Sequence, residues 1–76
     1  MLKFIIMIKN NLSEILGKKR MKMSELQITT GLSYSTINDL YHNKTTSIGF
    51  DTVDKICDAL EITVGELFEH VPNSGN

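Results

Sequence analysis

The clearest hydrophobic periodicity in the chain lies in residues 50–60. Apolar side chains recur there at the three- and four-residue spacing that places them on one face of a helix. They are Phe50, Val53, Ile56, Cys57 and Leu60. We predict an amphipathic helix over this segment, with all five side chains facing the core.

A second apolar stripe begins at Leu12 and predicts a helix nearer the N-terminus. Residues 11–14 (Asn-Leu-Ser-Glu) have the form of a capping box, in which the first side chain accepts a hydrogen bond from a first-turn amide. We expect this helix to end near Arg20. Because glycine inside a helix costs about 1 kcal/mol relative to alanine, an earlier end with a bend at Gly17 is the alternative boundary.

Another capping box opens a last short helix near the C-terminus. Thr63 and Glu66 have the spacing at which the two residues exchange hydrogen bonds across the first turn. Leu67 and Phe68 follow as inward-facing residues. Proline cannot continue a helix, so we expect regular structure to end at Pro72.

Two short helices separated by a glycine are predicted in the middle of the chain. Residues 24–30 make about two helical turns, and Gly31 can adopt the positive φ that often follows a helix end. Ser33 can then cap the next helix with its hydroxyl. One face of that helix carries the apolar residues Ile37, Leu40 and Tyr41, and the other carries Ser35, Asn38, Asp39 and His42. This pattern predicts a helix-turn-helix whose second helix presents a polar face suited to a major groove.

The predicted fold class is therefore all-α, with five short helices around one core. A chain of 76 residues has room for one small domain. We divide it into an N-terminal extension at 1–9, a helix-turn-helix domain at 10–71 and a flexible tail at 72–76.

The only strand candidate is the apolar run at residues 4–8 (Phe-Ile-Ile-Met-Ile). Two interpretations stay open: a strand that pairs with its copy in a partner protomer, or an extension that precedes an internal start at Met7. Exposed on a monomer, such a run would favour aggregation, so we favour its burial in a dimer. It is too short for a signal peptide or a membrane span.

The residue types argue against a metal centre, a cofactor or an enzyme. Cys57 is the only cysteine, which excludes an internal disulfide and suggests a reducing, cytoplasmic setting. His42 and His70 lack the spacing of metal ligands. No phosphate-binding loop or nucleophile motif is present. We expect Cys57 to be a core residue, and we expect neither a small-molecule ligand nor membrane association.

Charge is unevenly distributed along the chain, although the formal net charge is only −1. Residues 17–46 hold five basic and two acidic side chains, a net charge of +3. Residues 47–76 hold one basic and six acidic side chains, a net charge of −5. The positive charge thus coincides with the predicted helix-turn-helix, as nucleic-acid binding requires.

At residues 11–69 the chain resembles the Cro and phage-repressor type helix-turn-helix family, also called the XRE family. The matching residues are Gly31-Leu32-Ser33, Ser35-Thr36-Ile37, Leu40, Asn43-Lys44 and the run from Leu60 to Phe68. The resemblance implies a compact five-helix repressor-like domain that binds double-stranded DNA sequence-specifically. It also implies a homodimer on a two-fold operator, usually as a repressor.

Position by position, the resemblance assigns two sets of DNA contacts. The expected base-contacting residues are Tyr34, Ser35, Asn38 and Asp39. The expected phosphate-contacting residues are Lys22, Met23, Ser33, Thr36, Lys44, Thr45 and Thr46. Two alternatives remain: Asp39 is a surface carboxylate paired with a nearby lysine, and Tyr34 packs over the turn between the helices.

Three departures from the family pattern modify these expectations. Met23 occupies a phosphate-contacting position but cannot donate a hydrogen bond, which leaves Lys22 or a backbone amide for that role. Gln27 replaces a small residue, so either its side chain turns outward or the two helices splay. The second helix of the helix-turn-helix lacks Arg and Lys, which predicts that the protein binds DNA with modest affinity or depends on dimerisation to bind it.

A protein-interaction module of the same fold, of the antitoxin or anti-repressor type, is the alternative function. The neutral polar face of the second helix is compatible with a protein partner. If the chain does form a homodimer, the candidate surfaces are the N-terminal strand and the helical pair at 50–71.

Overall fold

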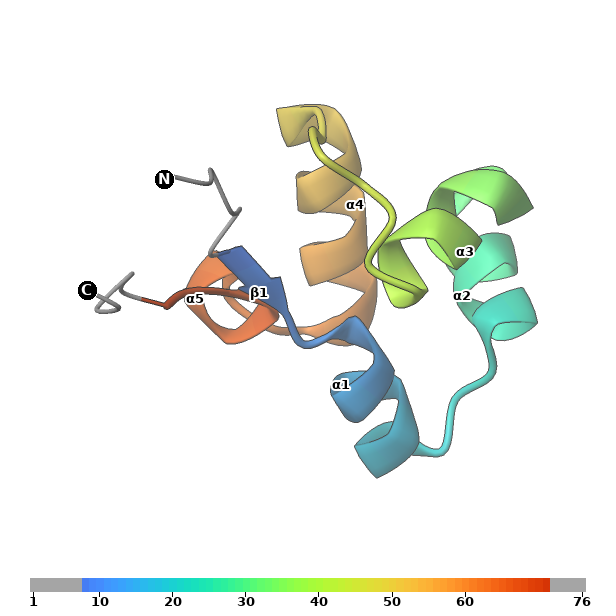
Figure 1. Cartoon of the computed structure of the whole chain (residues 1–76). Coiled ribbons are helices and arrows are strands. Elements are labelled where there is room, and N and C mark those ends of the chain that lie inside the picture. Colours follow the sequence, from blue (N-terminus) through green and yellow to red (C-terminus); the bar gives the residue numbers. More distant parts are fainter. Residues whose placement is uncertain (1–7, 72–76) are drawn as a thin grey trace.

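The computed structural model describes residues 8–71, which form five helices flanked by two short strands (Figure 1). In chain order the elements are β1 (Ile8–Asn10), α1 (Leu12–Lys19), α2 (Met23–Thr30), α3 (Tyr34–Tyr41), α4 (Phe50–Leu60), α5 (Val64–Leu67) and β2 (Phe68–His70). The five predicted helices are confirmed. None of the described helices is long and apolar enough to cross a membrane.

The all-α assignment is not exact, because the N-terminal strand candidate ends in β1, which forms a two-stranded antiparallel sheet with β2. Ile8 pairs with His70, and Asn10 pairs with Phe68. The sequence pattern did not predict β2, and Phe68 was expected in the last helix. The three residues of β2 directly follow α5 and are too few to show alternation. Ile8, which one of the two open interpretations paired with a second copy, pairs with His70 of its own chain. Residues 4–7 of that strand candidate lie outside the described residues, as do Pro72 and the tail.

The core lies where all five helices meet. Its buried side chains are Leu12, Leu16, Leu26, Ile37, Leu40, Ile56, Leu60 and Leu67. Every helix thus contributes at least one leucine or isoleucine. Burial of these apolar surfaces supplies the main stabilisation of the fold.

Phe50 does not join this core, contrary to the prediction for α4. Its side chain is 94% exposed, whereas Val53, Ile56 and Leu60 further along the same helix are buried. Phe50 is the first residue of α4, and Figure 1 shows this end of the helix extending away from α1 and α5. The periodicity was correct, but the apolar face continues one turn beyond the core.

The capping of α1 also differs from the prediction. Asn11 makes no side-chain hydrogen bond to the first turn of α1. The Oδ1 atom of Asn10 accepts from the Leu12 N–H instead, at 3.1 Å. Asn11 is turned toward α5, where its Nδ2 donates to the Glu66 carbonyl at 3.0 Å. The helix passes through Gly17 without ending there.

The predicted cap of α5 is confirmed. The Thr63 hydroxyl accepts from the Glu66 N–H at 3.1 Å, and the Glu66 carboxylate accepts from the Thr63 N–H at 2.8 Å. Two amides that the helix leaves unpaired are thereby satisfied within one turn. This cap orients α5 before the chain enters β2.

Candidate nucleic-acid interface

The turn between α2 and α3 has the predicted geometry. Gly31 has φ +76°, and its N–H donates to the Gln27 carbonyl at 2.8 Å. The Ser33 hydroxyl then accepts from the Thr36 N–H at 3.2 Å and caps α3. A glycine that reverses the chain and a serine that starts the next helix together fix the direction of α3.

Packing determines which face of α3 is available. Ile37 and Leu40 are buried in the core, and Tyr41 packs partly buried against it. Behind them, α2 packs on α3, with Leu26 also buried and Gln27 partly buried. Because the apolar side of α3 is buried against α2 and the core, the polar side of α3 faces outward.

The predicted base-contacting residues occupy this outward side. Ser35 and Asp39 are exposed, Tyr34 is 49% exposed, and Asn38 is partly buried. Neither of the two ion pairs among the described residues involves Asp39, so its carboxylate has no lysine partner there. The α3 surface is consequently neutral or acidic, with hydrogen-bonding groups and one aromatic ring.

Three hydroxyl groups cluster at the start of α3. The Oγ atom of Ser33 lies 2.8 Å from Thr36 Oγ1 and 3.3 Å from Ser35 Oγ. Each hydroxyl retains hydrogen-bonding capacity after these contacts. Ser33 and Thr36 therefore present a small polar cluster next to the positive end of the helix dipole.

The N-terminus of α2 is arranged differently from the expectation. The backbone N–H of Lys22 donates to the Glu25 carboxylate at 2.8 Å, so this amide already has a partner. The Met23 side chain packs against the core. Of the phosphate-contacting groups expected here, the exposed Lys22 ammonium group is therefore the most accessible.

The loop after α3 contains the other expected phosphate contacts. Asn43 has φ +60° and reverses the chain, and the Lys44 N–H donates to the Asp39 carbonyl at 2.8 Å. Lys44 and Thr46 are exposed, and Thr45 is partly buried. The loop thus starts from the last turn of α3 in a defined orientation.

A residue that the sequence pattern did not single out connects this loop to the rest of the domain. Asn10, in β1, donates from Nδ2 to the Leu40 carbonyl at 3.0 Å and to the Asn43 side-chain oxygen. The left-handed position of Asn43 is compatible with the known tolerance of asparagine for this conformation. No local pattern marks Asn10, because its partners lie 30 and 33 residues away.

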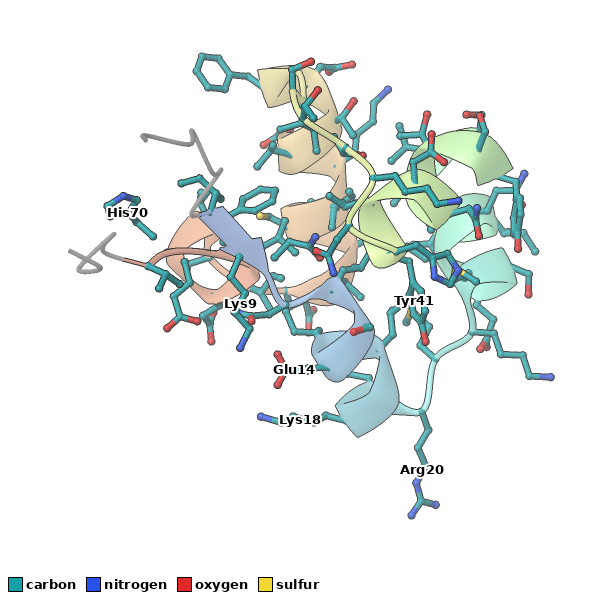
Figure 2. The ribbon with its side chains drawn as sticks, in the orientation of Figure 1. Lys9, Glu14, Lys18, Arg20, Tyr41 and His70 are labelled. Atoms are coloured by element: carbon teal, nitrogen blue, oxygen red, sulfur yellow. The ribbon has the colours of Figure 1, made fainter. Side chains whose placement is uncertain are left out.

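The basic side chains of residues 17–46 come from three segments: α1 and its C-terminal cap, the start of α2 and the loop after α3. The exposed members of the 17–46 segment are Lys18, Lys19, Arg20, Lys22 and Lys44. Figure 2 shows Arg20 extending from the end of α1, whereas Lys18 points to the side of α1 that carries Glu14 and lies away from α2 and α3. Lys18 is therefore the member of this set that is least suited to contact DNA bound at α3.

Cys57 lies partly buried beside the core on α4. Burial raises the pKa of its thiol, and the carboxylates of Asp54 and Glu66 raise it further. The described residues contain no group of three or more histidine, cysteine or acidic side chains placed to hold a metal ion. The environment of Cys57 suits a neutral thiol.

Three comparisons with known proteins agree with this geometry. The family model of the Cro/C1-type HTH DNA-binding domain matches residues 11–73. The uncharacterized HTH-type transcriptional regulator YozG of Bacillus subtilis (strain 168) is 30% identical over 60 residues, which cover 79% of this chain and 71% of YozG. The crystal structure of the transcriptional regulator VanUg, form II, superposes with a TM-score of 0.71 at 28% identity, and the match covers 96% of this chain and 97% of VanUg.

Proposed function

This chain belongs to the Cro/C1-type helix-turn-helix DNA-binding family of transcriptional regulators, and from that premise we propose that it is a sequence-specific repressor that binds double-stranded DNA as a homodimer. The observation that carries the proposal is the outward polar face of α3. The turn at Gly31 before the helix and the left-handed Asn43 after it fix the position of this face. We take α3 to be the recognition helix, which lies in the major groove.

Base recognition is assigned to four side chains of α3. Ser35 can donate or accept, Asp39 can accept from cytosine N4, and Asn38 can pair with adenine. Tyr34 can place its ring on a thymine methyl group and donate its hydroxyl to a phosphate. Because none of the four is a cation, their contribution is to sequence preference more than to overall affinity.

Phosphate binding is assigned to both ends of the helix-turn-helix. Ser33 and Thr36 lie at the start of α3, Lys22 lies at the start of α2, and Lys44 to Thr46 follow α3. Met23 belongs to this set through its backbone only, since its side chain packs against the core. Cationic contacts release counterions from DNA, so affinity should fall steeply with salt.

Homodimer formation is supported by apolar side chains that the folded chain leaves uncovered. Phe50 is 94% exposed, Ile8 is 52% exposed, and Val71 is 38% exposed. Covering this phenylalanine with a second copy would remove apolar surface from water and so favour association. In a dimer bound to DNA, the two α3 helices are expected to lie about 34 Å apart, one turn of the duplex.

The test is a fluorescence-anisotropy titration against a labelled duplex from upstream of the protein's own gene and a scrambled duplex, at low and near-physiological salt. We expect tighter binding to the upstream duplex, and we expect Ser35→Ala and Asn38→Ala to reduce that preference. Ser13→Ala, an exposed serine on α1, is the matched control and should bind as the unaltered protein does. Equal binding to both duplexes would contradict the proposal.

A protein-interaction role is the second candidate, and one observation favours it. Asp39 places an exposed carboxylate, without an ion-pair partner among the described residues, on the face that would meet DNA. Phosphate groups repel this charge, whereas a basic protein surface would attract it. Weak binding to both duplexes that disappears as salt rises would support this second role over DNA recognition.

A further inference from the structure

The Asn10 side chain connects three parts of the chain. Its Oδ1 accepts from the Leu12 N–H at 3.1 Å and thereby caps α1. Its Nδ2 donates to the Leu40 carbonyl at 3.0 Å, at the end of α3, and to the Oδ1 of Asn43. One amide group in β1 therefore contacts both the N-terminus of α1 and the C-terminus of the proposed recognition helix.

These contacts act on the residues that set the path of the chain after α3. The Leu40 carbonyl also accepts from the Asn43 N–H at 3.1 Å, so Asn10 and Asn43 share this acceptor. Asn43 has the left-handed conformation that turns the chain toward Lys44. Asn10 thus holds both the carbonyl and the side chain that define the turn preceding the phosphate-contacting loop.

Side-chain packing between the loop and the β1–β2 sheet is incomplete. A groove of about 680 Å³ lies between the β1–β2 sheet and the loop, and its walls include Ile8, Ile48, Phe68 and Thr46. Because the groove is open, the loop is not packed tightly against the β1–β2 sheet at this point. The Asn10 hydrogen bonds link the loop and the sheet across this gap in a defined direction.

We propose that Asn10 is a positioning residue for DNA binding, which holds the last turn of α3 and the loop of Lys44, Thr45 and Thr46 in the orientation that meets the phosphate backbone. This inference rests on the proposed DNA-binding function and deepens it. Asn10 itself does not touch DNA. It acts through Leu40 and Asn43, and the β1–β2 sheet becomes part of the DNA-binding apparatus.

The neighbouring Asn11 provides a matched control. It is also an asparagine with a side-chain hydrogen bond to a carbonyl, but its partner is Glu66 in α5, away from α3. Asn10→Ala and Asn11→Ala should both lower the midpoint of thermal unfolding. Only Asn10→Ala should weaken binding to the upstream duplex, by about fivefold for the lost hydrogen bonds. The same variant should reduce the magnitude of the slope of log K against log salt by about 0.9, the contribution of one phosphate contact.

A pair of aspartate variants separates positioning of the loop from capping of α1. Asn10→Asp keeps an oxygen that accepts from the Leu12 N–H but cannot donate to Leu40 or Asn43. The cap of α1 should therefore be kept, while the DNA affinity remains reduced because the new carboxylate oxygen faces two acceptors, the Leu40 carbonyl and Asn43 Oδ1. Asn11→Asp adds the same charge one residue away, so it corrects for electrostatic repulsion between the new carboxylate and DNA.

All five proteins are titrated at a temperature where circular dichroism shows them folded. If Asn10→Ala binds with the affinity and salt slope of the unaltered protein, the inference is wrong. It is also wrong if both alanine variants lose affinity in proportion to stability, or if Asn10→Asp binds no more weakly than Asn11→Asp. Should Asn10→Ala fail to fold, the aspartate pair decides. If the unaltered protein shows no preference for any duplex, the proposed function fails and the inference fails with it.

Discussion

The same substitution, glycine to alanine, should have opposite effects at two positions of this chain. Gly31 has φ +76°, a conformation that L-residues avoid, whereas Gly17 lies inside α1. A Cβ atom added at either glycine would meet no atom within 4 Å. Steric clashes with neighbouring groups are thus absent in both cases, and only the backbone conformation differs.

The magnitudes follow from that difference. A left-handed alanine costs about 1–2 kcal/mol, and the reduced entropy of the unfolded chain returns about 0.5–1 kcal/mol, so Gly31→Ala should lose about 1 kcal/mol of unfolding free energy. Gly17→Ala should gain about 1 kcal/mol, the propensity difference inside a helix. For a domain of this size, 1 kcal/mol shifts the unfolding midpoint by about 4–8 °C.

Thermal and urea unfolding followed by circular dichroism at 222 nm measure both effects. The two variants should differ by about 2 kcal/mol, with the unaltered protein between them. Gly31→Asn is a useful third variant, because asparagine tolerates the left-handed region and should recover part of the loss. If Gly31→Ala is as stable as the unaltered protein, or if Gly17→Ala is less stable, the backbone argument for these positions is wrong.

Three further predictions concern single side chains. Ser33→Ala removes the cap on the Thr36 N–H and should lower stability by about 1 kcal/mol in urea unfolding; a neutral result would show that the cap contributes nothing. Phe50→Ser should leave the unfolding midpoint of the monomer unchanged, because the ring is 94% exposed, but should weaken dimerisation at least about tenfold in sedimentation equilibrium; an unaltered dimer would remove Phe50 from the interface. Because the pKa of the Cys57 thiol is raised from its ordinary value of 9.0, the thiol of the folded protein stays protonated to a higher pH than the thiol of the unfolded chain. Its contribution to stability is therefore complete below about pH 9 and lost as pH rises through the folded pKa, and iodoacetamide should react faster in urea than with the folded protein at pH 8.5; equal rates would contradict the shift.

The features that were read correctly from the sequence depend on residues within one helical turn of one another. The positive φ of Gly31, the Ser33 cap and the Thr63–Glu66 capping box each require only the local backbone and one nearby side chain. The buried face of α3 follows from spacing alone. Local chemistry of this kind is encoded within four or five consecutive residues, so it can be predicted without knowing the tertiary fold.

The features that were missed depend on contacts between distant parts of the chain. Asn10 and Asn11 are adjacent and identical in type, yet one binds the end of α3 and the other binds α5. Local patterning favoured Asn11 as the cap of α1, and the strand pairing that turns Asn10 toward α3 decided otherwise. Phe50 illustrates the same limit, because helical periodicity defines a face but not where the core ends along it.

Because α3 itself carries no cation, only the basic side chains around it can neutralise phosphates. Their number sets an upper limit on how strongly salt can weaken DNA binding. Each phosphate neutralised contributes about 0.9 to the slope of log K against log salt. Of the five basic side chains in residues 17–46, Lys18 points away from α2 and α3. The other four, Lys19, Arg20, Lys22 and Lys44, allow a slope of no more than about 3.6 per protomer. Lys44→Ala should reduce the measured slope by about one, and a slope well above this limit would show that the DNA contacts extend beyond the helix-turn-helix.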